Sequence, residues 1–123
     1  MSRVDLRSDT LTLPTDEMRE AMAAAEVGDD VYGEDPTVHH LEEIAAEQVG
    51  MEAALYVPSG AMGNTCAMLS HAKHGEEVIF EERAHMFVWE CGAFANIAGL
   101  ASRTLTGPNG IIPPAQLREA IRG

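Results

Sequence analysis

One stretch of this sequence decides the fold: Val57-Pro58-Ser59-Gly60-Ala61-Met62-Gly63-Asn64. An apolar run, Ala53 to Val57, precedes it, and a segment with apolar residues at helical spacing follows it. The pattern therefore predicts a strand that passes through a glycine-rich turn directly into a helix.

A turn of this kind has two interpretations. The first N–H groups of a helix have no backbone partner, and the positive end of the helix dipole lies beside them, so a phosphate can bind there. Alternatively, the small residues only allow the helix to pack close to the sheet. The spacing matches neither the Walker pattern nor G-x-G-x-x-G, so a nucleoside triphosphate or a dinucleotide is not indicated.

The strand-then-helix alternation continues to the end of the sequence. The predicted elements are a helix to His74 before Gly75, a strand Val78–Phe80, a helix Met86–Ala98 before Gly99, a strand Arg103–Thr106 and a helix Pro114–Arg122. Such alternation is typical of an α/β fold, with a mostly parallel sheet that has helices on both faces.

The N-terminal part is helical and rich in loops. A short amphipathic helix is predicted from Asp16 to Ala25, and Gly28 opens a loop that closes at Asp35-Pro36, where Asp35 is an N-cap. The following helix stops at Gly50. We therefore expect residues 1–50 to form an N-terminal segment with helices, and residues 51–123 to form the first βα units of a larger domain.

Composition excludes several classes of partner. The 123 residues carry 20 acidic and 8 basic side chains, a formal charge of −12, which argues against binding to nucleic acid or an anionic membrane. No apolar stretch approaches the roughly 18 residues needed to span a bilayer, and no signal peptide is evident, so we expect a cytoplasmic protein. Cys66 and Cys91 stand in apolar helical contexts and predict two buried free thiols, with no metal site.

Four motifs together resemble one protein family. They are Asp5-Leu6-Arg7-Ser8-Asp9-Thr10, the stretch Glu26 to Pro36, Pro58-Ser59-Gly60 with Met62-Gly63-Asn64, and His85 ahead of Glu90. In this order they resemble the N-terminal part of the low-specificity L-threonine aldolases. The resemblance implies a fold-type I pyridoxal-phosphate enzyme of the aspartate-aminotransferase type, present here as an incomplete large domain.

The resemblance also implies an activity and a cofactor. Members of the family are lyases that split β-hydroxy-α-amino acids such as threonine into glycine and an aldehyde, with pyridoxal 5'-phosphate as electron sink. By similarity, the N–H groups of Gly60 and Ala61 would bind the cofactor phosphate. Ala61 stands where the family usually has threonine, so one hydroxyl contact would be absent.

His85 is the candidate catalytic residue. By similarity it would stack on the pyridine ring and handle the proton of the β-hydroxyl group, which suits a side chain that titrates near neutral pH. The alternative is a histidine that only caps a helix or is exposed. The other histidines, His39, His40, His71 and His74, are expected to be solvated.

Two further site residues follow from the resemblance. Ser8 would contact the substrate carboxylate, and Tyr32 would approach the cofactor from a neighbouring subunit. Without the resemblance, Ser8 is consistent with a local turn or cap and Tyr32 with a half-buried packing residue.

Members of the family are longer than this sequence. The portion that this sequence lacks carries the cofactor-binding lysine, the aspartate beside the pyridine nitrogen and the substrate-binding arginines. Lys73, the one lysine, lies outside the family's lysine motif and is consistent with a solvated helix end. We therefore expect the 123 residues alone to be inactive, and to need a homo-oligomer or a complementary chain. The alternatives are a non-catalytic, truncated aldolase-like assembly or regulatory subunit, and a related β-eliminating lyase.

Overall fold

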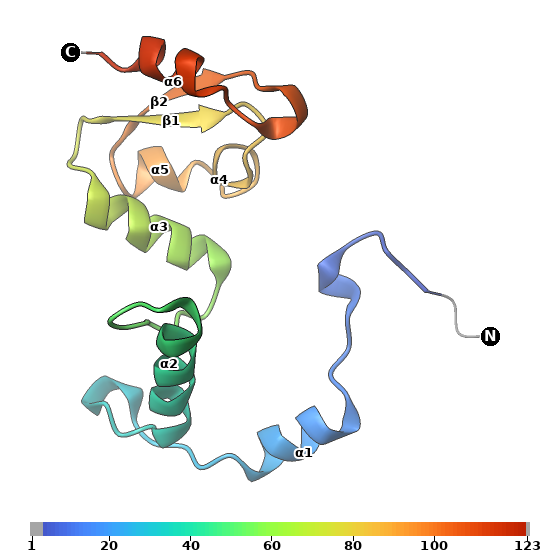
Figure 1. Cartoon of the computed structure of the whole chain (residues 1–123). Helices are drawn as coiled ribbons and strands as arrows, with labels where there is room; N and C mark the ends of the chain where they lie inside the picture. The colour runs from blue at the N-terminus through green and yellow to red at the C-terminus, as the bar shows by residue number, and fades with distance from the viewer. Residues whose placement is uncertain (1–3, 123) are drawn as a thin grey trace. The chain divides into compact units, whose positions relative to one another are not determined.

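The computed structural model describes residues 4–122. The chain divides into two compact units, of which one ends at Tyr56 and the other begins at Val57. Figure 1 shows the elements of both units in chain order.

The first unit contains two α-helices and two short 3-10 helices. They are η1 (Asp9–Leu11), α1 (Asp16–Ala24), η2 (Asp30–Tyr32) and α2 (Pro36–Val49). The side chains of Thr15 and Asp35 cap the two α-helices, because they accept hydrogen bonds from the free N–H groups of Met18 and Val38. Gly50 ends α2 in the left-handed conformation, as its position in the sequence predicts.

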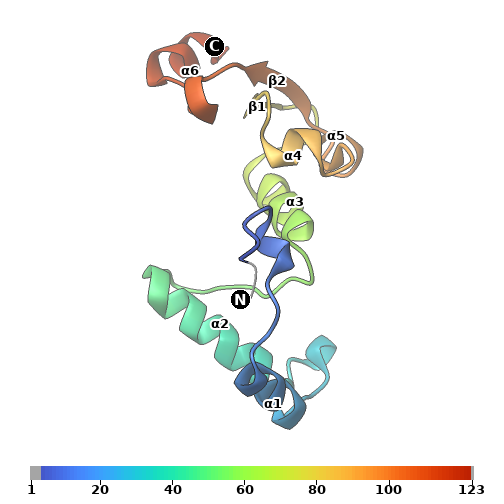
Figure 2. The same cartoon turned by 90° about the vertical axis from the view of Figure 1, so that its right-hand side faces the viewer.

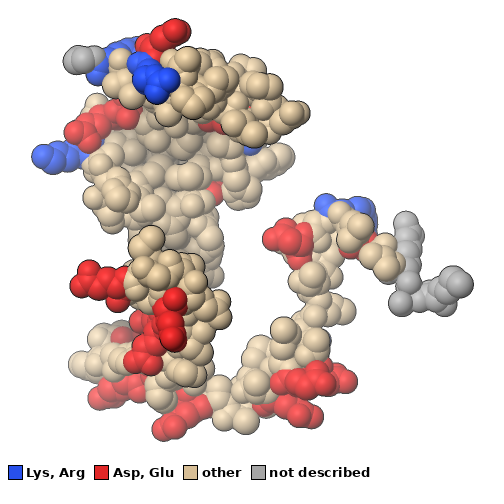
Figure 3. Space-filling view, in the orientation of Figure 1, with Lys and Arg blue, Asp and Glu red and all other residues tan. Residues whose placement is uncertain are grey.

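Little of the first unit is buried. Among its described residues only Asp35 and Ala46 have less than a tenth of their surface exposed. Large apolar side chains are open to solvent, and the most exposed are Val4, Leu6, Leu13, Val27, Val31 and Tyr32. Acidic side chains gather over α1 and α2 in the view of Figure 3. The described residues of this unit therefore leave many apolar side chains exposed and bury too few to form a core.

The second unit is built around two strands. Its elements are α3 (Gly60–His71), β1 (Glu77–Glu81), α4 (His85–Val88), α5 (Ala93–Asn96), β2 (Ala101–Leu105), η3 (Pro108–Gly110) and α6 (Pro114–Ala120). β1 and β2 pair in parallel, with Glu77 opposite Ala101 and Glu81 opposite Leu105. Parallel neighbours need a crossover, which α4 and α5 supply. The expected α/β fold with parallel strands is thereby confirmed.

An aromatic cluster fills the space between the strands and the helices. The rings of Phe80, Phe87 and Phe94 lie with centroids 5.2 to 5.8 Å apart, and Met68 from α3 belongs to the same core. Figures 1 and 2 show α6 on the side of the sheet away from α4 and α5. The core therefore fixes α3, α4 and α5 against one face of the sheet.

The predicted strand Ala53–Val57 is wrong. Residues 53–57 have no strand partner among the described residues, and the N–H of Tyr56 donates instead to the Glu42 carboxylate at 2.7 Å. An apolar run becomes a strand only where another strand accepts its backbone hydrogen bonds. Residues 53–57 have the apolar pattern of a strand, but within residues 4–122 β1 and β2 pair only with each other.

The single predicted helix Met86–Ala98 is also wrong, because the structure has α4 and α5 separated by a turn. Cys91 and Gly92 both adopt left-handed backbone conformations, with φ of 53° and 68°, and a helix cannot continue through them. Cys91 is exposed in this turn and Cys66 is half-buried, so the expectation of two buried thiols was wrong as well.

None of the helices within residues 4–122 has the length and apolar character that crossing a bilayer requires.

Candidate functional site

The turn before α3 presents free donors. Ser59 is the N-cap: its Oγ accepts from the N–H of Met62 at 3.2 Å, and its carbonyl oxygen accepts from the N–H of Gly63 at 3.1 Å. Within the described part of the chain, the N–H groups of Gly60 and Ala61 form no hydrogen bond. Apart from its chain neighbours and its own helix backbone, a methyl group placed on Gly60 would meet no atom within 4 Å, so there is open space on that side of Gly60.

These features suit an anion. Two N–H groups without partners stand at the N-terminus of a helix of 12 residues, where the helix dipole favours negative charge. Ala61 adds no side-chain donor. The turn can therefore bind a phosphate through backbone groups.

His85 is the first residue of α4 and follows β1 after a short turn. Its imidazole is 72% exposed, yet Nδ1 lies 2.9 Å from Oε1 of Glu90. The sequence offered helix capping as an alternative role for His85. Among residues 4–122 no side chain caps α4, and Nδ1 contacts Glu90 instead; the exposed ring agrees with the other alternative, an exposed histidine.

Glu90 is a buried acid in an apolar segment. Its side chain is 2% exposed, and the same Oε1 atom accepts a hydrogen bond from Nδ2 of Asn64 in α3 at 2.7 Å. Asn64 and Glu90 both lie in motifs of the sequence, but no role was predicted for either. The available signal was that Glu90 is the only charged residue in the segment Met86–Ala98.

The linked side chains of Asn64, Glu90 and His85 suggest proton transfer. An exposed imidazole that is oriented through one ring nitrogen can gain and lose a proton at the other. A carboxylate on the second nitrogen fixes the orientation of the ring. This arrangement would suit His85 to exchange a proton with a bound molecule.

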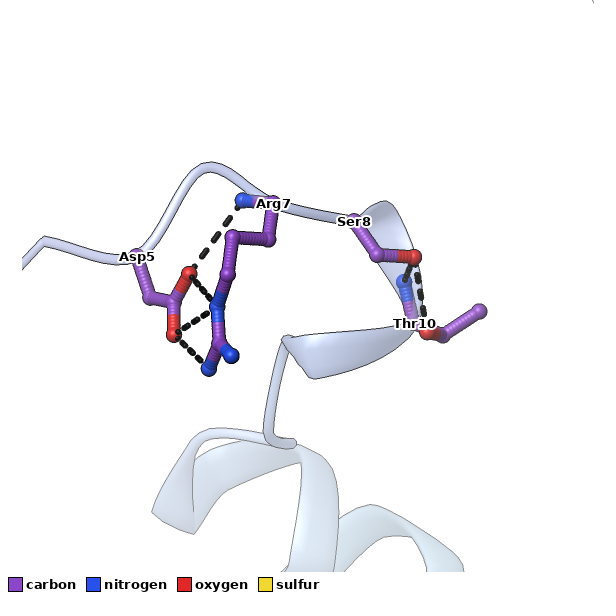
Figure 4. Close-up of polar contacts among 4 residues, drawn as sticks. All are labelled: Asp5, Arg7, Ser8 and Thr10. Carbon is purple, nitrogen blue, oxygen red and sulfur yellow. Dashed lines mark hydrogen bonds and ion pairs between the residues drawn. The ribbon is translucent and has the colours of Figure 1, made fainter.

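Ser8 lies in the first unit, where its hydroxyl takes part in a local turn. It is the N-cap of η1, and its Oγ lies 3.2 Å from the N–H of Thr10 and 2.8 Å from the Thr10 hydroxyl (Figure 4). Beside it, the Arg7 guanidinium and backbone N–H donate to Asp5 and lower the pKa of that carboxyl group. The local turn that the sequence allowed is therefore present, and a substrate contact of Ser8 stays a prediction.

Tyr32 is the last residue of η2 in the same unit. Its surface is 78% exposed, so it is not the half-buried packing residue that the sequence left open. An exposed aromatic ring on a loop is available to another segment. Its approach to a cofactor in a neighbouring subunit stays a prediction.

The predicted site residues are thus divided between the two units. Gly60, Ala61 and His85 belong to the second unit, and Ser8 and Tyr32 to the first. The four other histidines, His39, His40, His71 and His74, are exposed, as expected.

Comparisons with known proteins give a consistent result. The model of the β-eliminating lyase family matches residues 5–123. The chain is 49% identical over 120 residues to an uncharacterised protein of Caenorhabditis elegans, and the match covers 97% of this chain and 29% of that protein.

Two relatives have named activities. Low-specificity L-threonine aldolase 1 of Arabidopsis thaliana is 48% identical over 124 residues, with 99% of this chain and 35% of that protein covered. The low specificity L-threonine aldolase of Escherichia coli (strain K12) is 46% identical over 111 residues, with 89% and 33% covered. The chain therefore spans only 29% to 35% of the length of these three relatives.

Proposed function

The chain belongs to the β-eliminating lyase family, whose members depend on pyridoxal phosphate, and we propose that it forms the N-terminal part of an aldol-cleaving enzyme. The proposed substrates are β-hydroxy-α-amino acids, with threonine cleaved to glycine and acetaldehyde. The match covers about a third of each relative or less, so the proposal includes completion of the fold by further residues or by a second chain.

The open turn at Gly60 and Ala61 fits the cofactor phosphate. Its two free N–H groups and the dipole of α3 suit a dianion, and the space beside Gly60 is open. When bound, pyridoxal phosphate supplies an electron sink for the electron pair released as the Cα–Cβ bond breaks.

The proposed role of His85 is to accept the β-hydroxyl proton at Nε2. Nδ1 is engaged with Glu90, and the ring is otherwise exposed, so Nε2 is the nitrogen that a substrate can reach. Removal of this proton accompanies cleavage, because the hydroxyl becomes the carbonyl of the aldehyde product. Ser8 is proposed to bind the substrate carboxylate, and Tyr32 to approach the cofactor of a neighbouring subunit.

The apolar surface of the first unit supports the proposed assembly. Side chains such as Leu6 and Val31, 90% and 87% exposed, are rarely left in water over a wide area. We propose that a second copy of the chain or a complementary chain covers them.

The observation that carries the proposal is the identity of 46% and 48% to two L-threonine aldolases over most of this chain. The test is to supply L-threonine and pyridoxal phosphate to the complete enzyme that carries residues 1–123, and to identify the products. Acetaldehyde and glycine in equal amounts are expected.

The same assay separates the alternatives. The family description favours β-elimination as the second candidate, and that reaction would convert threonine into 2-oxobutanoate and ammonia. If these products replace acetaldehyde and glycine, the aldolase proposal is wrong. If the assembled, cofactor-loaded protein releases none of these compounds, a non-catalytic role is indicated.

A further inference from the structure

We infer that Glu90 is a positioning residue for His85, and that it holds the imidazole in the tautomer that has its proton on Nδ1 and a free lone pair on Nε2. The inference deepens the proposed function and rests on it for the link to catalysis. Its geometric part depends only on residues of this chain.

The hydrogen-bond pattern favours one tautomer when Glu90 is ionised. An amide NH₂ group can only donate, so the contact of 2.7 Å from Asn64 Nδ2 makes Oε1 of Glu90 an acceptor. The same oxygen lies 2.9 Å from Nδ1 of His85, where an ionised carboxylate can again only accept. A neutral imidazole has one N–H group, so Nε2 is left as the base.

Packing alone does not explain an acid at this position. Glu90 lies beside a cavity of about 420 Å³ whose other lining residues are Ala61, Met62, Thr65, Cys66, Ala93 and Ile97. Its second oxygen, Oε2, is buried without a hydrogen-bond partner among the described residues. A buried carboxylate with one unpartnered oxygen opposes folding, whereas an apolar side chain of similar size would not. Orientation of His85 is a function that an apolar side chain could not perform.

Asn64 connects this pair to the phosphate turn. It lies four residues after Gly60, and positions i and i+4 share one face of a helix. The hydrogen bonds from Asn64 to Glu90 and from His85 to Glu90 thus link the imidazole to the helix whose first turn presents the free N–H groups. The network therefore connects the proposed base to the helix that bears the proposed phosphate site.

The tautomer can be measured directly. The full chain is prepared with ¹⁵N-labelled histidine, and two-bond ¹H–¹⁵N correlations are recorded at alkaline pH, where imidazole rings are neutral. His85→Asn identifies the His85 signals among the five histidines. We expect Nδ1 of His85 to have the ¹⁵N shift of a protonated nitrogen and Nε2 that of a bare one. The opposite pattern, or an equal mixture, would overturn the inference.

Two variants at position 90 test the cause. Glu90→Gln keeps an acceptor oxygen and should keep the Nδ1–H tautomer, whereas Glu90→Leu removes it and should give a mixture of both tautomers. Glu82→Leu is the matched control, because Glu82 is exposed and bonds to Thr106 rather than to His85. An unchanged His85 tautomer in folded Glu90→Leu would contradict the inference. If Glu90→Leu does not fold, Asn64→Ala is the variant to measure. It should shift His85 from one tautomer toward a mixture of both.

The complete enzyme provides a second readout. Glu90→Leu should lower kcat for threonine cleavage by about tenfold to a hundredfold, with the dissociation constant of pyridoxal phosphate changed by less than about threefold. Glu90→Gln should recover most of the rate. An equal loss in both variants would indicate a structural role and overturn the inference. If the expected tautomer is found but threonine is not cleaved, the proposed function fails while the positioning of His85 stands.

Discussion

The carboxylate of Asp35 accepts a hydrogen bond from the N–H of Gly28 at 3.0 Å, and it thereby closes the loop that contains Tyr32. Its other oxygen caps α2 through the N–H of Val38 at 2.9 Å. The chain passes so closely here that a Cβ atom on Gly28 would lie 2.2 Å from the carbonyl oxygen of Glu34. One side chain thus sets both the start of α2 and the shape of the loop.

This relationship predicts a pH dependence. The N–H groups of Val38 and then Gly28 lower the pKa of Asp35 below its usual value of 3.8. A lowered folded pKa means that the stabilisation is complete above the unfolded value and is lost as pH falls through the folded value. The amide signals of Gly28 and Val38 should therefore titrate with a midpoint below 3.8. A higher midpoint would contradict the loop geometry, and Asp35→Asn should abolish this titration.

The aromatic core predicts a large effect at Phe80. This side chain is 5% exposed and contacts both other rings of the cluster, so Phe80→Ala should cost about 3–5 kcal/mol of unfolding free energy. Ile111 is 70% exposed and provides the control. Ile111→Ala should change the free energy of unfolding by less than about 0.5 kcal/mol. Denaturant unfolding measures both. Equal effects of the two substitutions would mean that the cluster is not the core of this unit.

Arg103 in β2 is expected to anchor α6. Its Nη1 donates to the carbonyl oxygen of Ala120 at 2.7 Å, and its Nε forms an ion pair with Glu77 at 2.9 Å. Arg103→Met keeps much of the side-chain volume but removes these bonds, so it should cost about 1.5–3 kcal/mol. Faster amide exchange in α6 should accompany the loss. Arg118→Met, at an exposed position of α6, should have little effect on either quantity.

Local signals allowed much of the fold to be predicted from the sequence. The N-cap Asp35, the following Pro36 and the stop at Gly50 define α2 through contacts within one turn of chain. The two paired strands were predicted within a residue or two of their bounds, because turn residues flank both, and the apolar run Val78–Phe80 marks β1. These features depend on near neighbours alone.

The predictions that were wrong or missing concern features that depend on residues far away in the sequence or on rare backbone conformations. Residues 53–57 carry an apolar pattern, but a strand also needs a partner, which the pattern does not specify. The break at Cys91 required a left-handed conformation at a residue that is not glycine, and such a conformation has no strong sequence signal. The hydrogen bond between Asn64 and Glu90 could not be predicted, because the two residues are 26 positions apart in the sequence.

The phosphate turn gives a prediction for cofactor affinity. Ala61→Thr adds a hydroxyl donor at the proposed phosphate site, and a hydrogen bond to a charged group contributes at most about 1.5–3 kcal/mol. Pyridoxal phosphate should therefore bind more tightly to Ala61→Thr. Any cost of fitting the branched side chain reduces this gain in binding free energy. Ala61→Val has nearly the same shape without the hydroxyl and should give no gain. Absorbance titration of the complete enzyme compares the variants, and equal dissociation constants for all three would contradict the assignment.

The central claim is that His85 acts on a proton during cleavage while the turn at Gly60 and Ala61 binds the cofactor. The direct measurement is acetaldehyde release from L-threonine by the cofactor-saturated complete enzyme with His85→Ala, compared with His71→Ala at an exposed position of α3. Loss of a general base predicts that kcat falls about 10² to 10⁴-fold in His85→Ala. The dissociation constant of pyridoxal phosphate should change far less, and His71→Ala should match the unsubstituted enzyme. Undiminished acetaldehyde release by saturated His85→Ala would contradict the account.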